Sequence, residues 1–235
     1  MKDPVLHPTL TIFAGRFGSG KTEAAINYAL SLVSAPGKGA SAAMGQVVLI
    51  DLDIVTPYFR SREMAEAMQR QGVQVIAPSI VGQHLDVPAI TPQILGAIQQ
   101  VEKPAVLDVG GDKQGARALG QFSPAIRQRG YTMHFVVNPY RPFTQTLEGL
   151  ASSISEIETS AHLQVSSLVS NPNLIGETTI SNIVEGHATI EGFAKTLGLP
   201  IAFVCLERHW AEALSATHFR QPVQVLDRHF VMSWE

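Results

Sequence analysis

Short apolar runs alternate with amphipathic stretches along most of this chain. The apolar runs cover residues 10–14, 47–52, 73–77, 105–109, 132–137, 165–169 and 201–206, and several of them are continuous. Helical spacing of apolar positions predicts helices near 21–33, 60–71, 92–101, 114–129, 143–161, 178–197 and 207–216. Continuous apolar strands are typical of a parallel sheet that is buried on both faces. We therefore expect an α/β fold with a mostly parallel, doubly wound sheet and helices on both faces.

Helix-breaking residues separate these elements. Gly72, Gly130 and the sequence Gly198-Leu-Pro200 stand where three of the expected helices end. Residues 34–45 and 78–91 are rich in Gly, Ser, Ala or Pro and predict loops. No internal repeat interrupts the β-α alternation, so residues 1–235 are interpreted as a single domain.

Composition restricts the class of protein. Hydrophobic residues make up 45% of the 235 residues and charged residues 16%, which supports a sizeable core. The net charge of −3 comes without a basic block, so no nucleic-acid partner is expected. The single cysteine, Cys205, excludes an internal disulfide and a Cys-x-x-Cys metal site. The N-terminus does not resemble a signal peptide, and no apolar run reaches the ~18 residues that a membrane span needs, so we expect a cytoplasmic protein without membrane contact.

A phosphate-binding loop follows the first apolar run and opens the first helix. It matches G-x-x-x-x-G-K-[ST] in full and consists of Gly15, Arg16, Phe17, Gly18, Ser19, Gly20, Lys21 and Thr22. Glycines let the backbone N–H groups converge on phosphate oxygens, and the helix N-terminus adds its positive dipole end. Lys21 is expected to reach the β- and γ-phosphates, and the Thr22 hydroxyl to ligate Mg²⁺.

Acidic residues end two further strands. Asp51 and Asp53 stand two positions apart at the end of the second strand, so both can face one site. Asp108 ends a later strand as a Walker B aspartate does, and Gly110 and Gly111 follow it in a turn suited to sensing a γ-phosphate. Solvated strand ends or helix N-caps are the structural alternatives for these residues. With the phosphate loop in the same chain, Thr22, Asp53 and Asp108 become the candidate Mg²⁺ ligands.

These motifs, in this order, resemble the MinD/ParA branch of the SIMIBI class of P-loop NTPases. The sequence from Asp51 to Glu63, together with residues 138–144 and 170–174, is similar to a poorly characterised bacterial subgroup described only as ATP-binding. The resemblance implies slow ATP hydrolysis that switches a nucleotide-dependent homodimer or a protein partner. It assigns Asp53 to orienting the attacking water, with Asp51 as its companion. It also places Asn171 at the adenine, whose N6 and N7 suit an amide.

The sequence departs from this pattern at two positions. The family has a lysine at the second position of the phosphate loop, where it reaches the nucleotide of the partner subunit, and this chain has Arg16. Arg16 therefore acts either as a finger in trans or as a solvent-exposed side chain. In the family a proline usually follows the aspartate that corresponds to Asp53, the aspartate of the first switch segment. This chain has Ile54 at that position.

Two other functions stay open on the same scaffold. One is an ATP-dependent small-molecule kinase or ligase, and the other is a GTPase, although the chain lacks Asn-Lys-x-Asp. The histidines are scattered, so His84, His209, His218 and His229 are interpreted as surface or core residues. Arg60 and Arg62 follow the first switch and are read either as phosphate or partner contacts or as a solvated helix start.

Overall fold

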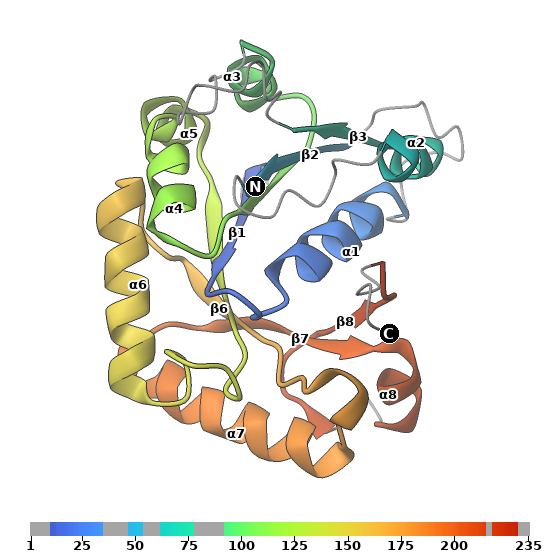
Figure 1. Ribbon diagram of the computed structural model, residues 1–235, viewed down its shortest axis with the longest axis vertical. Coiled ribbons are helices and arrows are strands. Elements are labelled where there is room, and N and C mark those ends of the chain that lie inside the picture. Colours follow the sequence, from blue (N-terminus) through green and yellow to red (C-terminus); the bar gives the residue numbers. More distant parts are fainter. Residues whose placement is uncertain (1–9, 35–46, 54–61, 78–91, 215–217, 230–235) are drawn as a thin grey trace, which may run out of the picture.

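All eight strands of the described chain belong to one parallel sheet (Figure 1). The computed structural model describes residues 10–34, 47–53, 62–77, 92–214 and 218–229. The strands are β1 (Leu10–Gly15), β2 (Val47–Leu52), β3 (Val73–Ile76), β4 (Ala105–Val109), β5 (Thr132–Val137), β6 (Ser167–Ser170), β7 (Ile201–Glu207) and β8 (Val223–Leu226). Their order across the sheet is β3-β2-β4-β1-β5-β6-β7-β8, and every neighbouring pair is parallel. The predicted α/β fold class is therefore confirmed.

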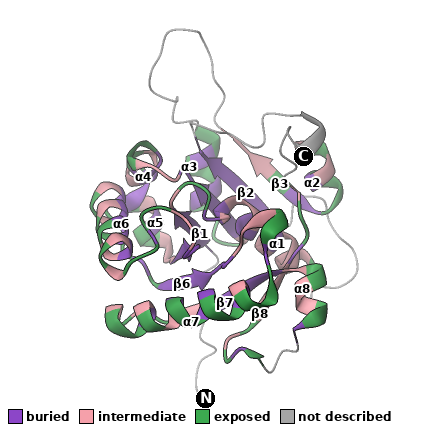
Figure 2. Ribbon diagram, turned by 60° about the horizontal axis from the view of Figure 1, so that its bottom comes forward, coloured by how far each residue is buried: buried purple, intermediate pink, exposed green. Residues whose placement is uncertain are grey.

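Helices cover both faces of this sheet. They are α1 (Lys21–Ser34), α2 (Arg62–Arg70), α3 (Pro92–Gln99), α4 (Lys113–Gly120), α5 (Ser123–Arg129), α6 (Leu147–Ala161), α7 (Ile180–Leu197) and α8 (Arg208–Ala213). Helices α1 and α2 pack on one face, and α3 to α7 contribute to the core on the other (Figure 1). The strands in the middle of the sheet are almost entirely buried, the edge strands β3 and β8 are only partly buried, and exposed positions gather on the outer sides of the helices (Figure 2). This two-sided burial explains the continuous apolar runs in the sequence.

The order of the strands reverses direction at β1. The chain proceeds from β1 outward through β2 to β3, returns to β4 beside β1, and then crosses to β5 on the other side. The carboxyl end of β1 is therefore a topological switch point, where open α/β sheets bind their ligands. The phosphate loop begins at this strand end.

Two element predictions were wrong. The helix expected over 114–129 is two helices, α4 and α5, because Pro124 cannot continue the hydrogen-bond ladder of α4 and instead stands in the first turn of α5. Strand β8 was not predicted, since it is only four residues long and comes directly after Pro222. The remaining predicted strands and helices exist, with ends shifted by a few residues.

Several sequence predictions lie outside the described residues. These are the loop at 35–45, the loop at 78–91 with His84, and the positions of Ile54 and Arg60. Among the helices that the structure describes, none combines the length and apolar character needed to cross a bilayer.

Candidate functional site

The phosphate loop has the backbone that its glycines allow. Gly18 and Gly20 have φ angles of 76° and 84°, which are values that other residues rarely adopt. A Cβ atom on Gly20 would lie 2.2 Å from Nδ2 of Asn171, so this position also has no room for a side chain. The Ser19 N–H donates to Arg16 O at 3.0 Å inside the loop, and Ala24 N–H donates to Gly20 O as α1 begins. Ser19 Oγ is buried and has no hydrogen-bond partner among the described residues.

Lys21 contacts the residues at the carboxyl end of β2. Lys21 Nζ lies 3.3 Å from Asp53 Oδ2, and both side chains are buried. Asp51 is fully buried, and its Oδ1 accepts the backbone N–H of Asp53 at 2.8 Å. The Asp51 carboxylate therefore bonds to the backbone of Asp53, whereas the Asp53 carboxylate pairs with Lys21.

Thr22 and Asp108 form the second contact of the site. The Thr22 hydroxyl donates to Asp108 Oδ2 at 2.6 Å, and Asp108 Oδ1 is buried without a hydrogen-bond partner among the described residues. Asp51 and Asp108 face each other in the register of β2 and β4. Burial raises the pKa of Asp108 to about 6, although the Lys21 charge and the Thr22 hydroxyl act to lower it. A buried carboxylate with an unpaired oxygen is well suited to a cation.

The residues present fit a magnesium ion that arrives with phosphate. Mg²⁺ keeps several waters and takes only one or two protein ligands in addition to phosphate oxygens. Thr22 Oγ1 and the free oxygen of Asp108 would provide these ligands. Asp53, the third candidate, is engaged by Lys21 in this structure. Among the described residues, no three His, Cys, Asp or Glu side chains come together as a metal cluster.

The turn after β4 touches the phosphate loop directly. A Cβ atom on Gly111 would lie 2.6 Å from the backbone N of Phe17, and one on Gly110 would lie 3.4 Å from Asp53 Oδ1. Asp112 then caps α4 by accepting the N–H of Gly115 at 2.8 Å. The turn therefore connects the phosphate loop, Asp53 and α4.

Arg16 contacts its own chain. Its Nε donates to Ser153 Oγ at 2.9 Å, its guanidinium pairs with Glu156 on α6, and it stacks over the ring of Phe143. Only 18% of the arginine side chain is exposed. Arg16 is thus not a free surface residue in this structure, and reaching another subunit would require it to leave Glu156.

Asn171 supports the phosphate loop from the end of β6. Its Nδ2 donates to Ser19 O at 2.7 Å, and the residue is 5% exposed. One N–H of the amide is therefore used by the loop itself. The sequence indicated the polar residue but not this contact.

Residues 138–144, which follow β5, were not given a role from the sequence. The structure places them beside the phosphate loop, where Phe143 stacks on Arg16 and Arg141 lies against Gly18. The Asn-Pro-Tyr-Arg-Pro pattern could have signalled a rigid loop, because its prolines restrict the backbone. Nothing in the pattern indicates which side chains of the loop reach the site.

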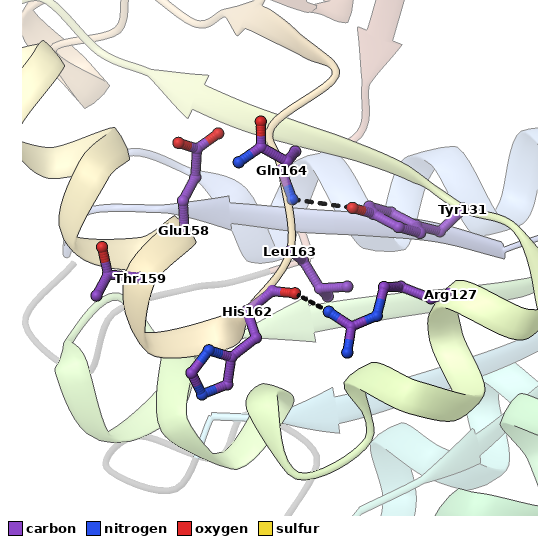
Figure 3. A pocket seen from close by; sticks show the side chains of 7 residues that line it. All are labelled: Arg127, Tyr131, Glu158, Thr159, His162, Leu163 and Gln164. Carbon is purple, nitrogen blue, oxygen red and sulfur yellow. Dashed lines mark hydrogen bonds between the residues drawn. The ribbon is translucent and has the colours of Figure 1, made fainter.

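A separate hollow lies at the opposite ends of the strands from the phosphate loop (Figure 3). Its volume is about 390 Å³, and it is lined by Arg127, Tyr131, Glu158, Thr159, His162, Leu163 and Gln164. These residues precede β5 and β6, so the hollow lies at the amino ends of the strands. Arg127 donates to His162 O, and the Tyr131 hydroxyl accepts the N–H of Gln164. These polar groups are engaged with one another and do not belong to the phosphate site.

Cys205 is buried, and burial raises the pKa of its thiol, which suits a core residue. His209 and His218 are exposed, and Trp210 is half-buried.

No model of a known protein family matches the sequence, and no curated protein matches it. Solved structures do resemble it. The cell division protein FtsY from Thermotoga maritima has a TM-score of 0.54 and 19% identity over 86% of this chain and 63% of its own. FtsY from Mycoplasma mycoides has a TM-score of 0.50 and 16% identity over 85% of this chain and 61% of its own.

The 54 kDa protein of the signal recognition particle from Aeropyrum pernix, solved in complex with GDP, has a TM-score of 0.49 at 16% identity over 86% of this chain. The chain spans 63% of the Thermotoga structure, 61% of the Mycoplasma structure and 42% of the Aeropyrum structure. The likeness to the two FtsY structures shows that this chain has the α/β fold of P-loop NTPases.

Proposed function

We propose that this chain binds Mg·ATP at the phosphate loop, hydrolyses it slowly, and uses the two nucleotide states to switch a homodimer or a protein partner. The observation that carries this proposal is the meeting of Lys21, Asp53, Thr22 and Asp108 at the carboxyl ends of β1, β2 and β4. We infer that all described elements serve one nucleotide-binding domain of the SIMIBI class. Its place in the MinD/ParA branch rests on the sequence resemblance.

Binding follows from charges that are already in position. The backbone N–H groups of the phosphate loop and of the N-terminus of α1 donate hydrogen bonds to phosphate oxygens. Lys21 exchanges Asp53 for the β- and γ-phosphates, because a phosphate carries more negative charge than one carboxylate. Asp108 and Thr22 would hold Mg²⁺, which when bound neutralises charge on the phosphates. The buried free oxygen of Asp108 is the group that this arrangement satisfies.

Hydrolysis requires a positioned water. Once Lys21 has turned to phosphate, Asp53 is released to accept a hydrogen bond from water beside the γ-phosphate. The hydrogen bond from the Asp53 N–H to Asp51 fixes the backbone at this point. The turn at Gly110 and Gly111 changes conformation when the γ-phosphate is lost, because it contacts both Asp53 and Phe17. The change is passed on to α4, which follows the turn.

The choice of adenine is a separate part of the proposal. Asn171 stands beside the phosphate loop and retains an acceptor for the adenine amino group and a donor for N7. Guanine offers an oxygen where adenine has the amino group, so the Asn171 acceptor would face another acceptor. We expect ATP to compete better than GTP for a fluorescent ATP analogue. Tighter binding of GTP would change the proposal to a GTPase.

The decisive experiment is isothermal titration of Mg·ATP into wild-type protein and Lys21→Ala. The variant is expected to lose measurable binding, because it removes the side-chain charge that the phosphate loop directs at the β- and γ-phosphates. Lys195→Ala is the matched control, since this exposed lysine lies at the end of α7. Wild-type affinity in Lys21→Ala would refute the phosphate-loop assignment. Formation of a product other than ADP and phosphate with a metabolite mixture would favour the kinase or ligase alternative.

A further inference from the structure

The loop after β5 holds Arg141 in a fixed backbone position. The Thr144 hydroxyl donates to Asn138 O at 2.6 Å, and Thr144 N–H donates to Arg141 O at 3.2 Å. Asn138 Oδ1 accepts the N–H of Tyr140, and Arg141 N–H donates to Asn138 O. Asn138 and Thr144 are 1% and 0% exposed, so these bonds are shielded from water.

The same loop is anchored to its neighbours. Asn138 Nδ2 donates to Asn173 O at 2.7 Å, and the Tyr140 hydroxyl donates to Asn182 O at 2.7 Å. Phe143 has a φ angle of 70°, a value that costs energy for a residue with a side chain. Such a conformation persists only where the surroundings determine it, and strained positions of this kind cluster at ligand sites.

The Arg141 side chain lies against the middle of the phosphate loop. A Cβ atom on Gly18 would lie 3.2 Å from Nε of Arg141, 3.4 Å from its Cδ and 3.7 Å from its Cζ. The guanidinium therefore flanks the loop from the β5 side, whereas the contacts of Lys21 and Thr22 come from β2 and β4.

The charge of Arg141 has no counterpart on the described chain. Its Nε is buried without a hydrogen-bond partner among these residues, and no ion pair joins it to a described carboxylate. By contrast, Arg16 pairs with Glu156 and Arg208 pairs with Asp227. A buried guanidinium donor is costly to leave unsatisfied, so its position beside an anion-binding loop requires an explanation.

We propose that Arg141 is a second cation of the phosphate site, which contacts a phosphate group of the nucleotide bound to its own chain. This inference rests on the proposed nucleotide binding and adds a binding residue to it. The planar fork of arginine suits two phosphate oxygens, and the fixed backbone of the loop reduces the entropy lost on contact. Arg141 and Lys21 then hold the phosphates from opposite sides of β1.

The experiment compares Arg141→Ala, Arg141→Met and Arg141→Lys by titration with Mg·ATP, and by competition with inorganic tripolyphosphate. Methionine keeps much of the length and packing of the side chain but removes the charge. We expect the alanine and methionine variants to bind both ligands at least about tenfold more weakly, the scale of one charge-assisted hydrogen bond. Arg141→Lys should recover part of the loss, and Arg117→Ala, at an exposed position of α4, should bind as wild type does.

Three outcomes would overturn the inference. Wild-type affinity of Arg141→Met for both ligands would mean that Arg141 only packs against the loop. Weaker ATP binding with unchanged tripolyphosphate binding would place the contact on the nucleoside. Absence of Mg·ATP binding by the wild-type protein would refute the proposed function as well, so the two failures are distinguishable. Thermal unfolding of each variant shows whether it is folded. If the alanine variant does not fold, Arg141→Lys still tests the role of this position.

Discussion

At the scale of single residues, two buried side-chain contacts of the site would be replaced by contacts to the nucleotide and its Mg²⁺ when they bind. Lys21 is held by Asp53, and Thr22 is held by Asp108. Both acidic partners are groups that the proposed mechanism needs elsewhere, Asp53 at water and Asp108 at Mg²⁺. Phosphate would therefore replace one protein contact with a stronger one, which keeps the buried lysine paired in both states.

Asp53 is the residue for which this exchange makes the sharpest prediction. In Asp53→Asn, Mg·ATP binding should persist, because Lys21 then meets phosphate without a competing carboxylate. Turnover should fall by at least ~10², the usual scale for a positioned acid–base group. Phosphate release under single-turnover conditions measures the effect. A variant that hydrolyses ATP at the wild-type rate would contradict the role given to Asp53.

His134 gives a prediction about pH and stability. It lies on β5 between Phe13, Tyr28 and Phe203, and burial lowers its pKa from 6.5 to about 4. The unfolded chain therefore binds more protons than the folded chain between these values, so stability is lost as the pH falls from 6.5 to 4. The loss from this residue is at most about 3 kcal/mol.

Replacing His134 with phenylalanine should remove that part of the pH dependence. Denaturant unfolding of wild type and His134→Phe at several pH values between 4 and 7 measures it. The free energy of unfolding of the variant should fall less steeply toward pH 4. Its value at pH 7 can differ from that of the wild type, because the substitution removes the hydrogen bond between His134 and Ser167. Equal slopes for the two proteins would show that His134 does not titrate as its burial implies.

At the scale of elements, the sequence predicted what depends on local pattern. Apolar runs placed seven of the eight strands found in the described residues, and the motif placed the turn between β1 and α1, which runs from Gly15 to Lys21 as its fixed spacing requires. The break between α4 and α5 was missed although Pro124 was visible, because a proline is also compatible with a kinked helix. The pairing of Arg16 with Glu156 joins residues 140 positions apart and has no local signature.

The turn after β4 allows a test at this scale. Gly111→Ala would bring a methyl group to 2.6 Å from the Phe17 backbone, so the turn must move away from the phosphate loop. We expect weaker Mg·ATP binding and slower turnover, while the sheet stays folded. Gly192→Ala on α7 is the matched control, because nothing lies within 4 Å of its added carbon.

This control should leave nucleotide binding unchanged and stabilise α7 by up to about 1 kcal/mol. Thermal unfolding and titration of the two variants separate an effect at the site from an effect on the fold. Wild-type ATP binding and turnover by Gly111→Ala would show that the contact between the turn and the loop is not needed for function.

At the scale of the whole molecule, the fold alone does not determine the task. The chain shares its architecture with FtsY at 19% identity, and one α/β scaffold can support switches, kinases and ligases. A switch differs from a kinase or a ligase in that its nucleotide state changes its assembly or its affinity for a partner. The proposed switch therefore has to be tested on assembly as well as on hydrolysis.

The last prediction concerns this assembly and uses Asp53→Asn to hold the protein in its ATP state. We expect that variant to form a homodimer with Mg·ATP and a smaller species with ADP, because closing two subunits around ATP excludes water and strengthens the charges acting on the γ-phosphate.

If Arg16 contributes in trans, it must first leave Glu156. Adding Arg16→Ala should then weaken the ATP dimer, whereas adding Glu156→Gln should strengthen it by releasing the arginine. Glu148→Gln, at an exposed position of the same helix, should have no effect. Light scattering over a concentration series reads out each variant with ATP and with ADP. Identical masses in the two nucleotide states would exclude the dimer switch, and a dimer indifferent to both Arg16 and Glu156 would restrict Arg16 to its contacts within one chain.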